Sequence, residues 1–232
     1  MKKYKHIYFD LDRTLWDFET NSQLVLKEIY IKHQLQSRGI PTFNDFHKSY
    51  LPINHQLWDN YRIGAINKEF LNLERFYATL RSFNIQDKAL AKAIGNDYVN
   101  LSPHQTALFP GTHELLNKLQ HDYHLHIITN GFLEVQTIKL KTSKLENYFE
   151  KIIISETTPW KKPTPDLFLF ALEQANAKAE ESLMIGDDIN ADIKGAAAVG
   201  IDQVWTNFTA SQVKFKPTYT VSKLIDILNL LN

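Results

Sequence analysis

The chain has 232 residues and no formal net charge, because 26 lysines and arginines balance 26 aspartates and glutamates. Its hydrophobic fraction of 44% is enough for a sizeable core, which excludes global disorder. The neutral balance argues against nucleic acid or an anionic membrane as a partner. The absence of cysteine excludes disulfides, thiolate metal sites and a cysteine nucleophile.

The N-terminal segment predicts neither a signal peptide nor a membrane anchor. The basic residues between Met1 and Lys5 lead directly into a strand, with no apolar signal core after them. No window of the sequence is long and apolar enough to span a bilayer. We therefore expect a cytoplasmic protein.

The first predicted element is a β-strand that begins at His6 and ends in two aspartates, Asp10 and Asp12, with Thr14 two positions later. An apolar run of this kind is typical of a buried parallel strand, whose carboxyl end is where open α/β sheets bind ligands. Two carboxylates this close repel each other. A divalent cation, a shared proton or a basic neighbour could neutralise them.

The next part of the chain is predicted to be entirely helical. Apolar residues recur at helical spacing over 24–38, 67–83 and 89–101, and one or two further helices between 46 and 61 are interrupted at Pro52. A helical domain inserted after the first strand explains this better than helices that simply cover the sheet. We expect an α/β core formed by 1–16 and 101–232, and a helical domain formed by 17–100.

Strands and helices then alternate to the end of the chain. The predicted strands are 124–129, 151–155, 182–186 and 203–206, and the predicted helices are 112–120, 133–145, 165–177, one that ends near 199, and 222–230. This alternation predicts a doubly wound parallel sheet of the Rossmann-like α/β class.

Polar groups follow four of these strands, where an open parallel sheet brings them to one crevice. In chain order they are Asp10 and Asp12, Thr129 and Asn130, the loop with Lys161 and Lys162, and finally Asp187, Asp188 and Asp192. Phosphoryl transfer through an aspartyl phosphate needs this mixture of groups. It uses a nucleophilic carboxylate, a hard cation such as Mg²⁺, a hydroxyl and a lysine for the phosphate, and a second carboxylate for proton transfer.

The same four motifs resemble those of the haloacid dehalogenase-type hydrolase superfamily, in the same order and over essentially the whole chain. The resemblance implies Mg²⁺ as cofactor and a mobile helical cap of the first cap class. It implies that Asp10 is the nucleophile and that Asp12 is the general acid and base, with the Asp12 backbone carbonyl also binding the metal. It assigns phosphate binding to Thr129, Asn130 and Lys162.

The fourth motif contains three aspartates. The resemblance implies that Asp187 binds the metal directly and that Asp188 and Asp192 lie in or near the layer behind it, although spacing alone does not separate Asp187 from Asp188. In the third motif we choose Lys162 over Lys161, because Lys162 directly precedes a proline.

A narrower resemblance concerns the substrate, for which we expect a small phosphomonoester and, within that class, a nucleotide. The segments 10–18, 129–136, 139–140 and 147–149 resemble a branch of 5′-nucleotidases that act on pyrimidine and non-canonical nucleotides. Trp16 and Phe18 follow the nucleophile loop, so we expect them to lie near the crevice mouth and to contact the substrate, with Phe132 as a further ring. Arg13 departs from the common family glycine, and its side chain is either tolerated there or directed toward the cap.

Several alternatives stay open at this point. The runner-up is a sugar-phosphate or phosphoglycolate phosphatase, and a phosphomutase shares all four motifs. A dehalogenase would not need Asp12, and a phospho-receiver domain would place its lysine after the last acidic cluster. His124 and His126 could form a metal pair on one strand face, but a packed or edge position is the better prediction. The oligomeric state is not predictable from the sequence.

Overall fold

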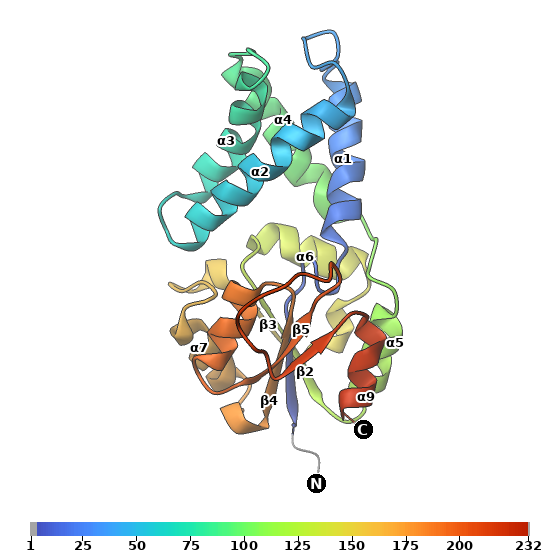
Figure 1. The fold of residues 1–232 in the computed structure, drawn as a ribbon, viewed down its shortest axis with the longest axis vertical. Coiled ribbons are helices and arrows are strands. Elements are labelled where there is room, and N and C mark those ends of the chain that lie inside the picture. Colours follow the sequence, from blue (N-terminus) through green and yellow to red (C-terminus); the bar gives the residue numbers. More distant parts are fainter. Residues whose placement is uncertain (1–3, 232) are drawn as a thin grey trace. The chain divides into compact units, whose positions relative to one another are not determined.

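The computed structural model describes residues 4–231, in which the chain divides into two compact units (Figure 1). One unit contains the chain up to Phe18 and from Thr106 onward, and the other is Glu19–Gln105. Residues 1–3, which include the basic Lys2 and Lys3, and the last residue, Asn232, lie outside the described part. That the helical unit acts as a cap stays a prediction.

A parallel sheet forms the centre of the first unit. Its six strands within the described residues are β1 (His6–Phe9), β2 (His124–Thr129), β3 (Lys151–Ile154), β4 (Ser182–Gly186), β5 (Asp202–Thr206) and β6 (Tyr219–Val221). They lie in the order β3-β2-β1-β4-β5-β6, and each neighbouring pair is parallel. The predicted fold class is therefore confirmed. Since β1 lies between β2 and β4, the residues that follow these three strands are neighbours.

Helices cover both faces of this sheet, as Figure 1 shows for α7 on one side and for α5 and α9 on the other. The helices of this unit are α5 (Thr112–Leu119), α6 (Leu133–Thr142), α7 (Pro165–Gln174), α8 (Gly195–Ala197) and α9 (Ile227–Leu231). Ile7 and Phe9 pack in one buried cluster with Leu115 of α5, whereas Tyr8 packs in the other with Phe168 of α7. This alternation along β1 explains why the strand is apolar on both faces.

The second unit consists of helices around a separate core. These are α1 (Phe18–Lys32, of which Phe18 belongs to the first unit), α2 (Phe43–Arg62), α3 (Lys68–Arg81) and α4 (Lys88–Leu101). Polar side chains fix the starts of three of them. Thr42, Asn67 and Asp87 each accept a hydrogen bond from the backbone N–H three residues later, which satisfies a group that the helix itself leaves free.

Two helix predictions in this unit were wrong in detail. The helix expected over 24–38 begins at Phe18 and ends at Lys32. Its buried face contains apolar residues such as Val25, Leu26 and Ile29, but its first turns bury the polar Asn21 and Ser22, which give no apolar signal. Leu24 is exposed, whereas Ser22 is buried and its hydroxyl lies 2.9 Å from that of Tyr98. Pro52 does not interrupt α2, which continues through it.

The end of the chain also differs from the prediction. Tyr219–Val221 forms the edge strand β6 beside β5, and α9 begins at Ile227 instead of at residue 222. A three-residue strand leaves little periodicity in a sequence, so it is visible only through its pairing.

Candidate active site

The polar residues of the four predicted motifs meet at the carboxyl-terminal ends of the strands. Asp10 directly follows β1, Thr129 is the last residue of β2, and Asp187 directly follows β4. Lys162 lies in the loop before α7 and reaches these strand ends with its side chain. Its Nζ atom donates a hydrogen bond to the Ile128 carbonyl in β2 at 2.8 Å. The parallel topology therefore brings together residues that are far apart in the chain.

Lys162 is buried between two carboxylates. Its Nζ atom lies 2.5 Å from Asp10 Oδ1 and 2.6 Å from Asp192 Oδ1, and its side chain is 3% exposed. Although burial opposes the charge, the carboxylates of Asp10 and Asp192 raise the pKa of Lys162. All three ammonium hydrogens are used by these two oxygens and the Ile128 carbonyl, so contact with a phosphate requires that one acceptor be exchanged.

The side chain of Asn130 holds the Lys162 loop. Its Nδ2 donates to the Lys162 carbonyl, and its Oδ1 accepts from the Lys162 N–H, both at 2.9 Å. This reciprocal pair fixes the backbone from which Lys162 projects. Lys161 is partly exposed, whereas Lys162 is buried at the strand ends, which supports the choice of Lys162.

Three carboxylates converge closely enough to share a cation. One oxygen from each of Asp10, Asp187 and Asp192 lies within 4.8 Å of the others. Burial and the Asp192 and Asp12 charges raise the pKa of Asp10 to about 7, despite Lys162. Burial and the same kind of repulsion raise the pKa of Asp187. A hard divalent cation would relieve this repulsion, and carboxylate oxygens are its preferred ligands, so the residues present fit Mg²⁺.

Asp188, the neighbour of Asp187, has a different environment. Its Oδ1 accepts hydrogen bonds from the N–H groups of Asn190 and Ala191, at 2.8 and 2.9 Å, and so caps the π-helix Ile189–Lys194. Its own N–H donates to Asp192 Oδ2 at 3.0 Å. Asp188 is absent from the convergent carboxylate group found among the described residues.

Gly186 makes room for Asp192. A Cβ atom at Gly186 would lie 2.3 Å from Asp192 Oδ2, far inside van der Waals contact. Asp192 is 1% exposed and bonded to Lys162. Asp192 therefore lies in the same buried group as Asp10 and Lys162.

Both carboxylate oxygens of Asp12 are held by α6. Lys139 Nζ lies 2.5 Å from Asp12 Oδ1, and Gln136 Nε2 donates to Asp12 Oδ2 at 2.8 Å. Gln136 Nε2 also donates to Thr129 Oγ1 at 2.7 Å, and the Gly131 N–H donates to the same oxygen. Because Thr129 Oγ1 already accepts twice, its own hydrogen is left to donate to a phosphate oxygen.

Sequence reasoning did not assign a role to Gln136 or Lys139. The available signal was their spacing, since they lie three positions apart on the helix that follows Thr129, and both are buried. Lys139 is a buried lysine of lowered pKa, because burial outweighs the opposing effect of the Asp12 carboxylate.

The aromatic residues after the nucleophile loop occupy two different environments. Trp16 is fully buried in the core of the first unit, with Lys139 Nζ 4.0 Å from its ring centroid and Phe18 edge-on at 6.2 Å. Its ring therefore packs and does not face a ligand, which corrects the prediction that it contacts substrate. Phe18 is half-buried, and the Arg13 guanidinium lies 4.2 Å above its ring. Phe132 is buried.

The backbone conformation at position 13 explains why glycine is common there. The φ angle of Arg13 is 64°, in the left-handed region that glycine adopts most easily. Arginine therefore accepts a conformation for which the family pattern prefers glycine, and its side chain extends over Phe18.

The histidines lie at the opposite end of the central strands. His6 Nδ1 is 3.1 Å from His126 Nε2, and the His6 ring stacks with that of His124 at 4.9 Å. His124 is exposed and bonds to Glu150 at 2.7 Å. Among residues 4–231 the metal-compatible cluster contains no histidine, and His126 is packed as predicted.

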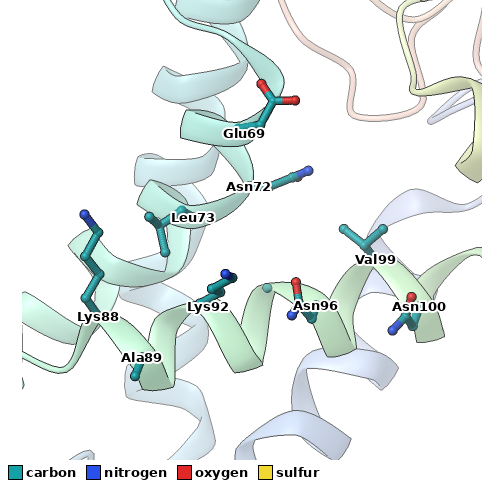
Figure 2. A pocket seen from close by; sticks show the side chains of 10 residues that line it. Glu69, Asn72, Leu73, Lys88, Ala89, Lys92, Asn96, Val99 and Asn100 are labelled. Atoms are coloured by element: carbon teal, nitrogen blue, oxygen red, sulfur yellow. The ribbon is translucent and has the colours of Figure 1, made fainter.

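A separate groove of about 820 Å³ lies in the helical unit (Figure 2). Its lining comes from α3 and α4 and includes Glu69, Asn72, Lys88, Lys92 and Asn96. None of the site residues predicted from the sequence lines it. Within the described residues no helix is both long and apolar enough to cross a membrane.

Comparison with known proteins agrees with the fold and the motifs. A family model for haloacid dehalogenase-like hydrolases matches residues 7–206. The pyrimidine 5′-nucleotidase PynA of Streptococcus pneumoniae is 33% identical over 234 residues, which cover 99% of this chain and 95% of that protein. The pyrimidine 5′-nucleotidase YjjG of Escherichia coli is 32% identical over 232 residues, 99% of this chain and 98% of that one.

A solved structure is similar over its full length. It is that of the HAD-hydrolase YfnB from Bacillus subtilis bound to magnesium, which matches with a TM-score of 0.89 and 30% identity, and the match covers 100% of both chains.

Proposed function

The chain belongs to the haloacid dehalogenase-like hydrolase family, and we propose that it is a magnesium-dependent phosphomonoester hydrolase that forms an aspartyl phosphate on Asp10. The observation that carries this proposal is the buried contact of Asp10 with Lys162, beside the carboxylates of Asp187 and Asp192. A nucleophilic carboxylate, a buried cation and a metal-compatible acidic cluster are the groups that this chemistry requires.

The proposed reaction has two steps. Asp10 attacks phosphorus, the bond from phosphorus to the leaving oxygen breaks, and Asp12 gives that oxygen its proton. Water then attacks the aspartyl phosphate, its proton passes to Asp12, and the bond between phosphorus and Asp10 breaks to release phosphate. Thr129 and Lys162 donate to the phosphate oxygens, and Asn130 holds the Lys162 loop in place.

Mg²⁺ would be held by Asp10 and Asp187, with Asp192 beside them. The family resemblance adds the backbone carbonyl of Asp12 as a further ligand. When bound, it would offset the charge of the phosphate and of the attacking carboxylate.

For the substrate we propose a nucleoside 5′-monophosphate with a pyrimidine or non-canonical base. Support comes from the two relatives named as pyrimidine 5′-nucleotidases, each similar over nearly the whole chain. Phe18 adds an aromatic ring just after the nucleophile loop, and base stacking on such a ring is worth roughly 1–3 kcal/mol in nucleic-acid complexes. We propose that Phe18, rather than the buried Trp16, contributes to base binding.

The test is phosphate release from a panel of esters with Mg²⁺. Pyrimidine nucleoside monophosphates should give higher kcat/KM values than phosphoglycolate or hexose phosphates. Excess chelator should abolish turnover, and Mg²⁺ should restore it. Phe18→Ala should lower nucleotide hydrolysis more than hydrolysis of a small generic ester. A panel led by sugar phosphates would reject the nucleotidase proposal and leave the hydrolase proposal standing.

Asp10→Asn tests the nucleophile in the same assay. It should fold and lose nearly all turnover, because uncatalysed phosphate ester hydrolysis is very slow. Asp166→Asn, which changes an exposed acidic residue in the first turn of α7, is the matched control and should keep full activity. Normal turnover by a folded Asp10→Asn protein would reject the mechanism.

A further inference from the structure

Lys139 is the second buried lysine that faces a carboxylate at the candidate site, and it lies outside the four motifs of the superfamily. Its side chain is 4% exposed, against 22% for its partner Asp12. A buried ammonium is costly unless it is paired and well contacted. Lys139 meets both conditions, since Asp12 Oδ1 lies 2.5 Å away and the Trp16 ring centroid 4.0 Å away.

Lys139 and its neighbour Gln136 each contact a different oxygen of the Asp12 carboxyl group. The Lys139 ammonium bonds to one oxygen of Asp12, while Gln136, one turn earlier on α6, donates to the other. Two donors on one rigid helix therefore fix the rotation of the Asp12 carboxyl group. Trp16 supplies an electron-rich face for the ammonium, and Phe18 lies further out at 5.7 Å. Trp16 thus supports Lys139 from the nucleophile loop itself.

We propose that Lys139 is a positioning residue for the proton transfer by Asp12, and this inference rests on the proposed hydrolase function. In the first step the bond from phosphorus to the leaving oxygen breaks, and the Asp12 proton moves to that oxygen. Negative charge then develops on the Asp12 carboxyl group, directly beside the Lys139 ammonium. The positively charged ammonium stabilises this negative charge, and the fixed orientation of the Asp12 carboxyl group directs its proton toward the leaving oxygen.

The proposal predicts a dependence on the leaving group. An ester whose leaving oxygen is strongly basic, such as a nucleoside monophosphate, needs the proton from Asp12. p-Nitrophenyl phosphate needs it little, because its leaving phenolate is stable without a proton. A general acid contributes about 10²–10⁴-fold to a rate. Lys139→Met replaces the buried ammonium by an apolar side chain of similar length. It should therefore change the hydrolysis rates of the two esters by different factors.

The experiment measures kcat/KM for the full-length protein with Mg²⁺ on p-nitrophenyl phosphate, phenyl phosphate and a nucleoside monophosphate. Lys139→Met should lower kcat/KM for the nucleotide by roughly 10–100-fold, which is a part of the general-acid contribution. The kcat/KM for p-nitrophenyl phosphate should change by less than about threefold, because this ester needs the proton little. Lys139→Arg, which retains a cation, should recover much of the loss. The matched control Lys141→Met changes an exposed lysine of the same helix and should behave like wild type.

Equal losses on all three esters, or an increase on the nucleotide, would overturn the role of Lys139. An increase would mean that Lys139 restrains Asp12 in an unproductive orientation. The wild-type rates on the same panel report separately on the hydrolase proposal, so failure of the two can be distinguished. Circular dichroism and thermal melting of each variant establish that the comparison is made between folded proteins.

Discussion

At the scale of single residues, the chain places titratable groups in two very different surroundings. At the carboxyl ends of the strands, lysines and carboxylates are buried together and paired. At the amino ends, His6 and His126 are buried against each other without a carboxylate contact between them. The first arrangement keeps charged lysines and carboxylates together at the candidate site. The second lowers the pKa of both imidazoles, chiefly through burial, which links their protonation to stability.

The histidine pair predicts an acid-sensitive fold. Burial and the neighbouring His6 lower the pKa of His126 from its ordinary 6.5 to about 4. The unfolded chain therefore binds a proton at higher pH than the folded chain does. Stability from this residue is fully present above pH 6.5 and is lost as the pH falls through 4, by about 3 kcal/mol in total. Urea unfolding at a series of pH values measures the loss.

The control for this prediction is the variant His126→Gln, because other groups also titrate in this range. The raised pKa of the Asp10 carboxyl acts in the opposite direction, and His6, His124, Lys151 and Glu150 all lie close enough to His126 to affect its pKa. Only the difference between wild type and variant isolates His126. That difference should shrink as the pH is lowered from 7 to 5. A difference that is constant across this range would contradict the prediction.

At the scale of elements, the sequence predicts which residues follow the strands and meet at the site. It does not predict which helix side chains contact them. Asp10, Thr129 and Asp187 follow apolar strands, and parallel topology alone implies that such ends meet. Lys139 and Gln136 lie inside α6, whose polar and apolar residues show no clear face, so periodicity could not predict which of its side chains point inward. Their direction follows from how α6 packs, which is a tertiary property.

The same limit explains the assignment of Trp16. Its position directly after the nucleophile loop predicts a place near the crevice. That its ring packs in the core is a tertiary property: the Trp16 backbone pairs with Leu108 and its ring contacts Lys139, and both residues are distant in sequence. Asp192 illustrates the converse. Its type and spacing were noted in the sequence, but its contact with Lys162 depends on the absence of a side chain at Gly186.

Asp187 and Asp188 are adjacent, but one follows β4 and the other caps the π-helix, so we expect their substitutions to have different effects on Mg²⁺ dependence and on stability. Asp187→Ala removes a carboxylate of the convergent group, so it should raise the Mg²⁺ concentration needed for half-maximal activity. Asp188→Ala removes a helix cap, which should cost about 1 kcal/mol of stability with a smaller effect on Mg²⁺ dependence. Magnesium titrations of activity and urea unfolding of both variants separate the two effects. The reverse order would assign the metal to Asp188.

At the scale of the whole molecule, one unit contains all of the predicted catalytic residues and the other contains none of them. All of these residues lie before Phe18 or after Thr106. The helical unit has its own buried core and its own capped helices. Its function is the least predictable from the sequence, because the recognition of a leaving group has no motif comparable to those of phosphoryl transfer.

Metal binding should be measurable on the whole molecule without turnover. The carboxylates of Asp10, Asp187 and Asp192 repel one another in a buried place, so a cation that binds only the folded chain should stabilise it. Stabilisation grows with the logarithm of the free metal concentration and reaches about 2.7 kcal/mol at one hundred times the dissociation constant. Thermal melting with Mg²⁺ should therefore give a higher Tm than melting with chelator. Asp187→Ala should remove most of this difference, whereas Asp166→Asn should retain it. A Tm that does not respond to Mg²⁺ in the wild-type protein would contradict the metal assignment, even if the chain hydrolyses phosphate esters.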